Sequence, residues 1–290
     1  MFPILAARLL APGIHEFVVQ APRVARKARP GHFVVIRVDE KGERIPLTLA
    51  DWDAEAGTIT LVVQEVGYST RLMGQLAAGD ALQDVLGPLG TAPPIEKVGT
   101  IIGVGGGVGV APLYPRIRGY KQAGNRVVAI AGARSRDLLI MVDRLRECSD
   151  ELHLATDDGS VGHHGFVSQV LEKLLDSGVR PAEVLAIGPV PMMRAVVEVT
   201  RPRGIPTTVS LNALMVDGTG MCGGCRVSVG GVTRFTCVDG PEFDGLQVDF
   251  AELQQRLQQY RSQEKLAADP AQRKEACRCL EQLTAPSFRG

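Results

Sequence analysis

The sequence lacks an excess of charge of either sign, because its 290 residues contain 32 Lys and Arg against 32 Asp and Glu. A basic surface that would attract nucleic acid or an anionic membrane is therefore not indicated. Long hydrophobic runs are also missing, since six glycines interrupt the most apolar stretch, residues 98–113. The first ten residues carry only Arg8 and lack the basic-then-apolar order of a signal peptide. We expect a cytoplasmic protein without nucleic-acid or membrane partners.

Cysteine is too scarce for a disulfide scaffold, since the chain has only six. They are nevertheless grouped, with Cys222, Cys225 and Cys237 close together and a second small group in residues 277–279. Grouped cysteines in such a chain indicate metal or redox chemistry. Cys148 stands alone, and we expect it to be a buried apolar residue. No Ser/His/Asp arrangement suggests a hydrolase.

The two halves of the chain differ in their pattern of secondary structure. The first half alternates short β-branched runs, such as residues 33–38 and 58–64, with Gly and Pro turns, which predicts a small antiparallel β-barrel. The second half alternates strands and helices, which predicts a parallel sheet. Strands are expected at 100–104, 127–131, 151–155 and 184–187, and helices at about 110–124, 136–148, 165–177 and 191–200.

The expected organisation has four parts, with the first boundary near Pro93 and Pro94. They are a β-barrel over residues 1–95, an α/β domain over 96–206, an irregular Gly- and Cys-rich module over 207–250, and a tail over 251–290. The module is too short for a core of its own, so a bound metal group is expected to organise it. Leu253, Leu257 and Tyr260 fall at helical spacing, which predicts a surface or partner-facing helix in the tail.

The strongest motif is D-x4-C-x2-C-x11-C, formed by Asp217, Cys222, Cys225 and Cys237. Plant-type [2Fe–2S] sites use C-x4-C-x2-C with a distant fourth cysteine, so Asp217 stands where the first thiolate is expected. The intervening glycines allow the chain to wrap tightly around an inorganic core. Two alternatives stay open: a Cys3Asp zinc site, and an Asp217 that only caps a turn.

The second motif is a glycine-rich loop between a predicted strand and a predicted helix. It comprises Gly105, Gly106, Gly107 and Gly109, followed by Ala111 and Pro112. Backbone N–H groups and a helix N-terminus at such a position favour the pyrophosphate of a dinucleotide. The alternative is a tight turn with close strand–helix packing. Residues 44–48 and 67–70 combine anion-binding or hydroxyl groups with a turn, although either one alone is an ordinary strand end.

Taken together, these segments resemble the ferredoxin–NADP reductase superfamily, in the branch that adds a C-terminal [2Fe–2S] module. Residues 44–51, 215–225 and 237–245 carry the resemblance, which covers about residues 1–250. It implies an FAD-binding barrel, an NAD-binding α/β domain and a cluster-binding module. Arg44, Pro46, Leu47, Thr48, Gly67, Ser69 and Thr70 are then expected to hold FAD, with Thr48 near the reactive N5 of the flavin.

The resemblance also assigns the nicotinamide side. Gly188, Pro189 and Met192 are expected to flank the nicotinamide, although Met192 and Leu47 could equally be core residues. The superfamily recognises the 2′-phosphate of NADP with Ser and Arg after the third α/β strand. Here Asp157 and Asp158 follow that strand, which favours NAD(H). One departure is that Ile45 and Leu47 replace the usual Arg and Tyr beside the flavin, so Arg44 is expected to replace the missing arginine.

The branch implies an oxidoreductase subunit that passes electrons between NAD(H), FAD and the cluster. The first hypothesis is a subunit of a flavin-based, bifurcating ferredoxin:NADP oxidoreductase. Its expected partner is a larger flavo-iron–sulfur subunit similar to the small subunit of glutamate synthase, with ferredoxin reached through the complex. The alternative is the electron-transfer subunit of a type B dihydroorotate dehydrogenase, a branch that uses cysteine where this chain has Asp217. A third reading is a zinc-binding assembly protein. Cys277 and Cys279 resemble a segment of the larger subunit, or they are incidental.

Overall fold

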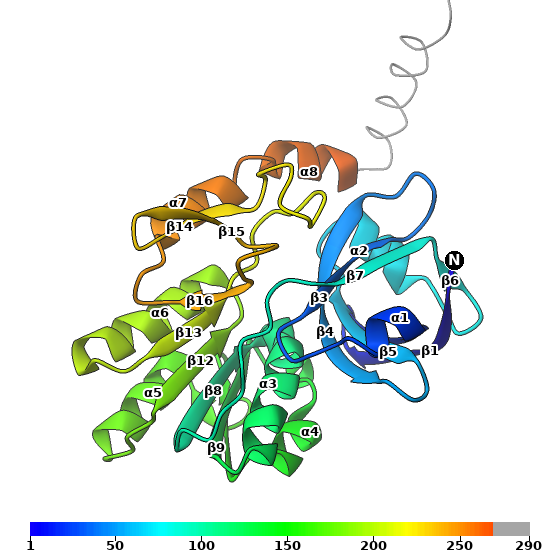
Figure 1. Cartoon of the computed structure of the whole chain (residues 1–290). Helices are drawn as coiled ribbons and strands as arrows, with labels where there is room; N and C mark the ends of the chain where they lie inside the picture. Colours follow the sequence, from blue (N-terminus) through cyan, green and yellow to red (C-terminus); the bar gives the residue numbers. More distant parts are fainter. Residues whose placement is uncertain (269–290) are drawn as a thin grey trace, which may run out of the picture.

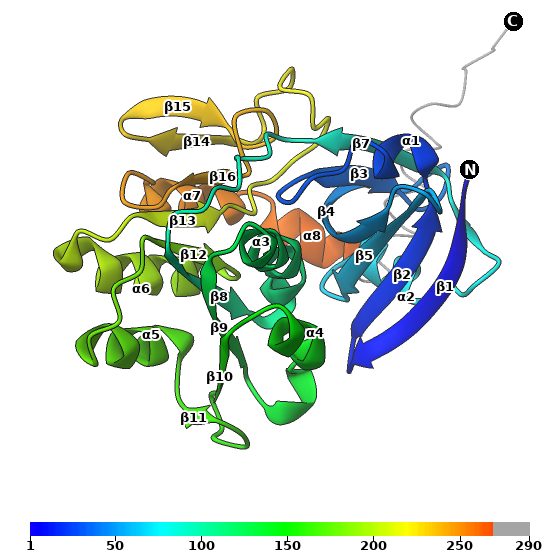
Figure 2. The same cartoon turned by 60° about the horizontal axis from the view of Figure 1, so that its bottom comes forward.

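A computed structural model describes residues 1–268 and contains two seven-stranded sheets and a two-stranded ribbon. Figure 1 shows the first sheet on the right, the second on the lower left, and the ribbon at the upper left with α7 (Phe250–Leu257). Figure 2 shows the ribbon and α7 side by side from a second direction. The antiparallel barrel followed by a parallel-sheet α/β domain, as the sequence predicted, is confirmed.

The first sheet is antiparallel and has the strand order β6-β1-β2-β5-β4-β3-β7. Its strands are β1 (Phe2–Ala11), β2 (Ile14–Gln20), β3 (Phe33–Arg37), β4 (Arg44–Asp53), β5 (Thr58–Gln64), β6 (Ala81–Leu82) and β7 (Asp84–Leu89). Two short helices, α1 (Pro22–Ala25) and α2 (Tyr68–Gly74), lie in its connections. Alternate residues of each strand point inward: Val34 and Ile36 join the barrel core, whereas Phe33 and Val35 join the core of the second sheet. The outer face of β3 therefore meets the rest of the molecule.

The second sheet has the order β11-β10-β9-β8-β12-β13-β16, and all of its pairs are parallel except β13–β16. Its strands are β8 (Thr100–Gly106), β9 (Arg126–Ala133), β10 (Glu151–Thr156), β11 (His163–His164), β12 (Glu183–Ile187), β13 (Thr207–Ser210) and β16 (Glu242–Asp244). Helices α3 (Val110–Gln122) and α4 (Val142–Glu147) pack on one face, and α5 (Val167–Asp176) and α6 (Val190–Thr200) pack on the other. Because both faces are covered, the central strands read as continuous apolar runs.

One predicted helix is wrong. Residues 136–148 form a 3-10 turn at Arg136–Leu138 and, after a break, the short helix α4. Met141 breaks the helix because it adopts a left-handed conformation with φ 56°. Ile140 beside it is buried in the core, so tertiary packing overrides the local preference for a continuous helix.

The module over residues 207–250 is more regular than its sequence indicated. β13 and β16 belong to the second sheet, and β14 (Arg226–Val229) pairs with β15 (Val232–Phe235) as the ribbon. The boundary predicted at 207 therefore falls at the start of a strand that is hydrogen-bonded to β12. The loop that carries Asp217, Cys222 and Cys225 thus follows a strand of the α/β sheet.

The tail begins with α7, whose Leu253 is buried and whose Leu257 packs against the core of the second sheet. Tyr260 lies beyond the end of α7, and α8 (Arg261–Ala268) follows and contacts α2. The tail is therefore partly a core element rather than only a surface helix. The residues Cys277 and Cys279 lie outside the described part of the chain. Among residues 1–268, none of the helices combines the length and apolar character that a membrane span requires.

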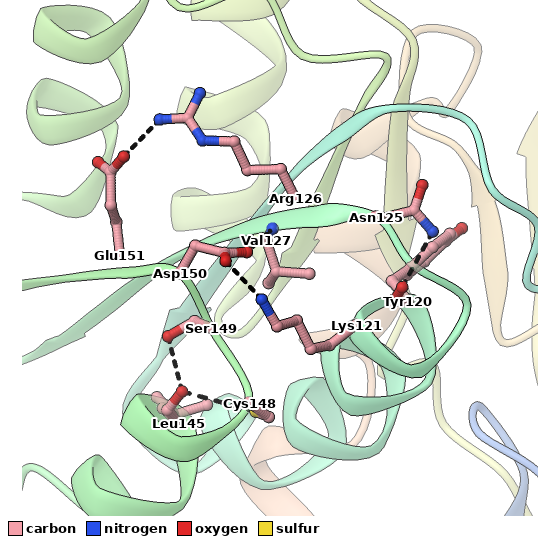
Figure 3. A network of polar contacts seen from close by, with 10 residues as sticks. All are labelled: Tyr120, Lys121, Asn125, Arg126, Val127, Leu145, Cys148, Ser149, Asp150 and Glu151. Atoms are coloured by element: carbon pink, nitrogen blue, oxygen red, sulfur yellow. Dashed lines mark hydrogen bonds and ion pairs between the residues drawn. The ribbon is translucent and has the colours of Figure 1, made fainter.

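A polar network holds the amino-terminal edge of the second sheet (Figure 3). The buried Asn125 side chain donates to the carbonyl oxygen of Tyr120 at 3.0 Å and accepts the N–H of Val98 at 2.7 Å. Asp150 accepts the N–H of Val127 at 2.8 Å and pairs with Lys121. These contacts fix the strand starts, and the opposite, carboxyl-terminal edge carries the candidate site.

Candidate cofactor site

The strand β4 carries the residues expected beside a flavin. Pro46 and Thr48 pair with Val35 and Phe33 of β3, so they share the outer face of the barrel that meets the second sheet. Leu47 points the other way and packs on the barrel core, which favours its core reading. Arg44 is exposed at the start of the strand. The structure thus places Pro46 and Thr48 at the boundary between the two sheets and Leu47 away from it.

The turn that begins α2 uses its own hydroxyl groups. Thr70 Oγ1 accepts the N–H groups of Val66 and Gly67, each at 2.9 Å, which closes the first turn of the helix. Ser69 is buried and donates from Oγ to the Glu43 carboxylate at 2.6 Å. Glu43 immediately precedes β4, so the two predicted flavin segments lie side by side. Hydroxyls and first-turn N–H groups gathered at this point fit a diphosphate, although Glu43 is an anion in the same place.

The glycine loop joins β8 to α3 at the carboxyl-terminal edge of the parallel sheet. A Cβ on Gly109 would lie 2.3 Å from the carbonyl oxygen of Ile187, and a Cβ on Gly106 would lie 2.3 Å from Met192 Sδ. Gly107 has φ +56° and open space around its Cβ position. Only glycine fits at position 109, because the contact there is with backbone, so the close packing that the sequence left as an alternative is real.

The same close approach brings two predicted segments together. Gly188 Cα lies beside Gly109, and a Cβ on Gly188 would meet Met192 Sδ at 3.0 Å. β8 and β12 are neighbours in the sheet, yet the connection from β8 leads to β9 on its other side. Such a point, where the strand order reverses, is where open α/β sheets bind nucleotides. Ala111 is buried and Pro112 half-buried in the first turn of α3.

Asp157 and Asp158 follow β10 and are both exposed. Asp158 Oδ1 accepts the N–H of Ser160 at 2.9 Å, and hydrogen bonds from Ser160 lower the pKa of this carboxyl. The Arg136 guanidinium donates to the Ser160 carbonyl oxygen at 2.9 Å, so a cation also lies at this loop. The loop therefore presents two carboxylates, with Arg136 tied to its backbone.

Two of the four predicted cluster ligands lie together. Cys225 and Cys237 are buried, with 3.2 Å between their sulfur atoms, and the Cys237 N–H points to Cys225 Sγ at 3.4 Å. Burial raises the pKa of Cys237 to about 12, and the neighbouring thiol contributes to the rise. Cys222 is exposed, and its sulfur accepts the Gly224 N–H at 3.4 Å.

Asp217 caps the loop in front of Cys222. Its Oδ1 accepts the Thr219 N–H at 2.6 Å and its Oδ2 accepts the Cys222 N–H at 2.7 Å, and these bonds lower the pKa of the carboxyl. Within residues 1–268, no three His, Cys, Asp or Glu side chains form a group that could hold a metal ion. Asp217, Cys222 and Cys225 lie on one glycine-rich loop, with Gly218, Gly220 and Gly223 at positive φ, and Cys237 follows β15. Three thiols and a carboxylate are the donor types that suit an iron–sulfur cluster.

The loop that carries Asp217 rests on the barrel, which sequence reasoning did not find. A Cβ on Gly218 would lie 2.9 Å from Val35 of β3 and 2.9 Å from Leu89 of β7. Residues 236–241, the arm that carries Cys237, are bound to residues 90–99, the linker after β7. Thr91 donates from N to the Gly240 carbonyl at 2.7 Å and from Oγ1 to the Val238 carbonyl at 2.8 Å. Nothing in the local sequence of Val35, Leu89 or Thr91 signals these contacts.

Comparison with known proteins places the chain among redox subunits. Residues 212–249 match the iron–sulfur cluster binding domain of dihydroorotate dehydrogenase B. The dihydroorotate dehydrogenase B (NAD(+)) electron transfer subunit homolog of Thermotoga maritima is 49% identical, over 89% of this chain and 91% of that protein. The electron transfer subunit of Geobacillus thermodenitrificans is 34% identical, over 83% of this chain and 94% of that protein.

Solved structures agree with these relatives. A structure of NADH-dependent reduced ferredoxin-NADP oxidoreductase, described for flavin-based electron bifurcation, is 47% identical, with a TM-score of 0.88 over 92% of this chain and 96% of that chain. The ferredoxin reductase in carbazole 1,9a-dioxygenase is 22% identical, with a TM-score of 0.59 over 71% of this chain and 65% of that chain, and shows the fold alone. The chain therefore carries an iron–sulfur binding domain on a ferredoxin reductase-like fold.

Proposed function

Because the chain belongs to the family of dihydroorotate dehydrogenase B electron-transfer subunits and their homologues, we propose that it is the NAD(H)-linked electron-transfer subunit of a flavin-based, bifurcating ferredoxin:NADP oxidoreductase. Membership of this family identifies the chain as a redox subunit of an oxidoreductase. The identity of the reaction and of the partner belongs to the proposal.

The observation that carries the proposal is the arrangement around β3. Gly218 of the cluster loop packs on Val35, and Val35 pairs with Pro46 of the flavin strand. Phe33 pairs with Thr48 in the same way, and all four side chains of these two pairs lie on the outer face of the barrel. One strand thus separates the cluster loop from the residues proposed to line the flavin, a short path for electrons.

When bound, FAD exchanges a hydride with NAD(H), and a [2Fe–2S] cluster carries single electrons. Pro46 and Thr48 would lie along the flavin ring, and the N-terminal turn of α2 with Ser69 would hold the diphosphate. The glycine loop would hold the NAD pyrophosphate, and Gly188 and Pro189 would border the nicotinamide. Cys222, Cys225 and Cys237 would hold the cluster, with Asp217 as the proposed fourth ligand.

NAD(H) is the proposed nucleotide because the Asp157 and Asp158 side chains are exposed where a 2′-phosphate would approach. Carboxylates repel a phosphate and accept hydrogen bonds from ribose hydroxyls. The Arg136 guanidinium lies at this loop, where it donates to the Ser160 carbonyl oxygen.

A second candidate is the electron-transfer subunit of dihydroorotate dehydrogenase B. The matched cluster-domain family and the relatives at 34% identity carry this name. Against it stands Asp217, because the resemblance assigns a cysteine to that position in this branch. Relatives named as electron transfer subunits imply a larger catalytic partner, and we propose a flavo-iron–sulfur subunit in that place.

The test is to purify the chain with its native partner and compare three reactions. The bifurcating assignment expects reduction of NADP that needs NADH and reduced ferredoxin together as electron donors, and no NAD-dependent oxidation of dihydroorotate. NAD-dependent dihydroorotate oxidation would instead establish the second candidate. A colourless protein with stoichiometric zinc would contradict both redox assignments, because flavin and [2Fe–2S] both absorb visible light.

A further inference from the structure

A buried ion pair lies at the point where the three parts of the molecule meet. Arg116 of α3 and Glu242 of β16 are 1% and 8% exposed, and 3.2 Å separates Nη2 from Oε2. Arg116 Nη1 also donates to the carbonyl oxygen of Pro93, in the linker from the barrel, at 3.1 Å. A Cβ on Gly31, which belongs to the barrel, would lie 2.9 Å from Glu242 Oε1. The pair therefore touches the barrel, the α/β domain and the cluster module.

The pair extends into a polar network inside the α/β domain. Arg116 Nη2 donates to Tyr120 Oη at 3.4 Å, and Tyr120 donates to Glu183 Oε2 at 2.8 Å. Thr208 donates to the other oxygen of Glu183 at 2.6 Å. Arg116 Nε nevertheless has no hydrogen-bond partner, and Glu242 Oε2 has the ion-pair contact with Arg116 but no hydrogen bond. An ion pair buried with unsatisfied atoms is a poor source of stability, because apolar side chains of similar size often do as well.

What the pair does provide is a fixed position for the arm that follows Cys237. Glu242 lies at the end of this arm, and Arg116 fixes it to α3. Next to Glu242, the Pro241 carbonyl accepts the Leu211 N–H at 2.9 Å, and the Gly240 carbonyl accepts the Thr91 N–H at 2.7 Å. The contacts hold one face of the cluster module against the linker after β7, close to the strand that separates it from β4.

We propose that Arg116 and Glu242 are positioning residues for electron transfer between the flavin and the cluster. This inference rests on the proposed function. The pair acts through the Cys237 arm: it holds the arm in one register on the barrel linker and so fixes the separation over which one electron passes from reduced flavin to oxidised cluster. Small displacements of a reacting group cost large factors in rate, which makes a specific ionic contact useful here even where it adds little stability.

The test uses the holoprotein with its partner and the double variant Arg116→Met/Glu242→Leu. The control is Arg126→Met/Glu151→Leu, which removes a solvent-exposed Arg–Glu pair at the far edge of the same sheet (Figure 3). We expect the NADH-driven bleaching of the flavin and the iron content to stay as in the wild type, while reduction of the cluster slows at least tenfold. Amide exchange of Thr91 and Leu211 should become faster only in the first variant. Equal cluster reduction in both double variants would overturn the proposal.

A second variant covers the case in which the first does not fold. Glu242→Gln keeps the size of the side chain and removes its charge, and it should slow cluster reduction at least threefold. Arg116→Lys keeps the charge and should stay within twofold of the wild type. If Glu242→Gln reduces the cluster at the wild-type rate, the inference is wrong and the proposed function is unaffected. A wild-type protein in which NADH reduces the flavin but never the cluster would instead remove the proposed function, and the inference with it.

Discussion

Ser69 donates its hydroxyl hydrogen to the carboxylate of Glu43, with 2.6 Å between Oγ and Oε2. The bond joins the turn of α2 to the start of β4, the two segments proposed to hold FAD. It also places a negative charge where we propose a diphosphate, and two anions at this separation repel.

We therefore predict that Glu43→Ala tightens FAD binding. Removal of the carboxylate frees the Ser69 hydroxyl and lifts the repulsion, so the dissociation constant should fall about threefold to tenfold, or ~0.7–1.4 kcal/mol. Flavin fluorescence during titration of the apoprotein measures it. Glu40→Ala removes an exposed carboxylate from the same loop and serves as the control. Weaker binding in Glu43→Ala would mean that Glu43 helps to hold the cofactor.

The Asp217 carboxylate has two separable roles, capping and coordination. We predict that Asp217→Cys keeps the cluster but changes its paramagnetic resonance g-values and potential, because a thiolate is a softer ligand than a carboxylate. Asp217→Ala should lose iron or hold it weakly. Asp239→Asn is the control, since Asp239 caps the Phe235 N–H in the neighbouring loop at 2.7 Å. Unchanged spectra in Asp217→Cys would leave Asp217 as a cap only.

The nucleotide preference should depend on the loop after β10. We predict a higher kcat/KM for NADH than for NADPH in reduction of the bound flavin. Asp157→Ser/Asp158→Arg should improve the value for NADPH at least tenfold, because it replaces two repulsive charges with a phosphate-binding pair. Asp176→Ser, at the far end of α5, should change neither value. A higher kcat/KM for NADPH than for NADH in the wild-type chain would refute the assignment of NAD(H).

The free energy of unfolding of the apoprotein should depend on pH through the Glu242 carboxyl. Burial raises the pKa of this carboxyl to about 7, against the opposing effect of Arg116 and with a contribution from Glu183. A raised folded-state pKa means that the contribution to stability is fully present below about pH 4.5 and is lost as the pH rises through about 7. The loss is at most about 3–4 kcal/mol, at about 1.4 kcal/mol for each pH unit between the two values.

Urea unfolding of wild type and Glu242→Gln from pH 5 to pH 8 measures this contribution. The wild type should lose more free energy of unfolding over this range than the variant, whose amide does not titrate. Asp244→Asn, an exposed carboxylate on the same strand, should follow the wild type. Parallel curves for wild type and Glu242→Gln would show that Arg116 keeps the carboxyl ionised throughout.

The sequence by itself determined the elements and the chemistry of the site. The β-branched run of residues 58–64 predicted β5 with its true bounds, because β-branched side chains pack well on a pleated sheet. The spacing of Cys222 and Cys225, and the glycines at 105–109, likewise encode local backbone shapes that suit a cluster and a pyrophosphate. A resemblance to known proteins then named the cofactors.

Only the tertiary structure decided how these pieces meet. Met141 breaks a predicted helix with a left-handed conformation next to the buried Ile140, and residues 207–210 join the parallel sheet as β13. The packing of Gly218 on Val35, and of Arg116 on Glu242, joins residues far apart in the chain. The spacing of residues within a short segment does not predict such contacts, because they depend on how all the elements pack together and exclude water.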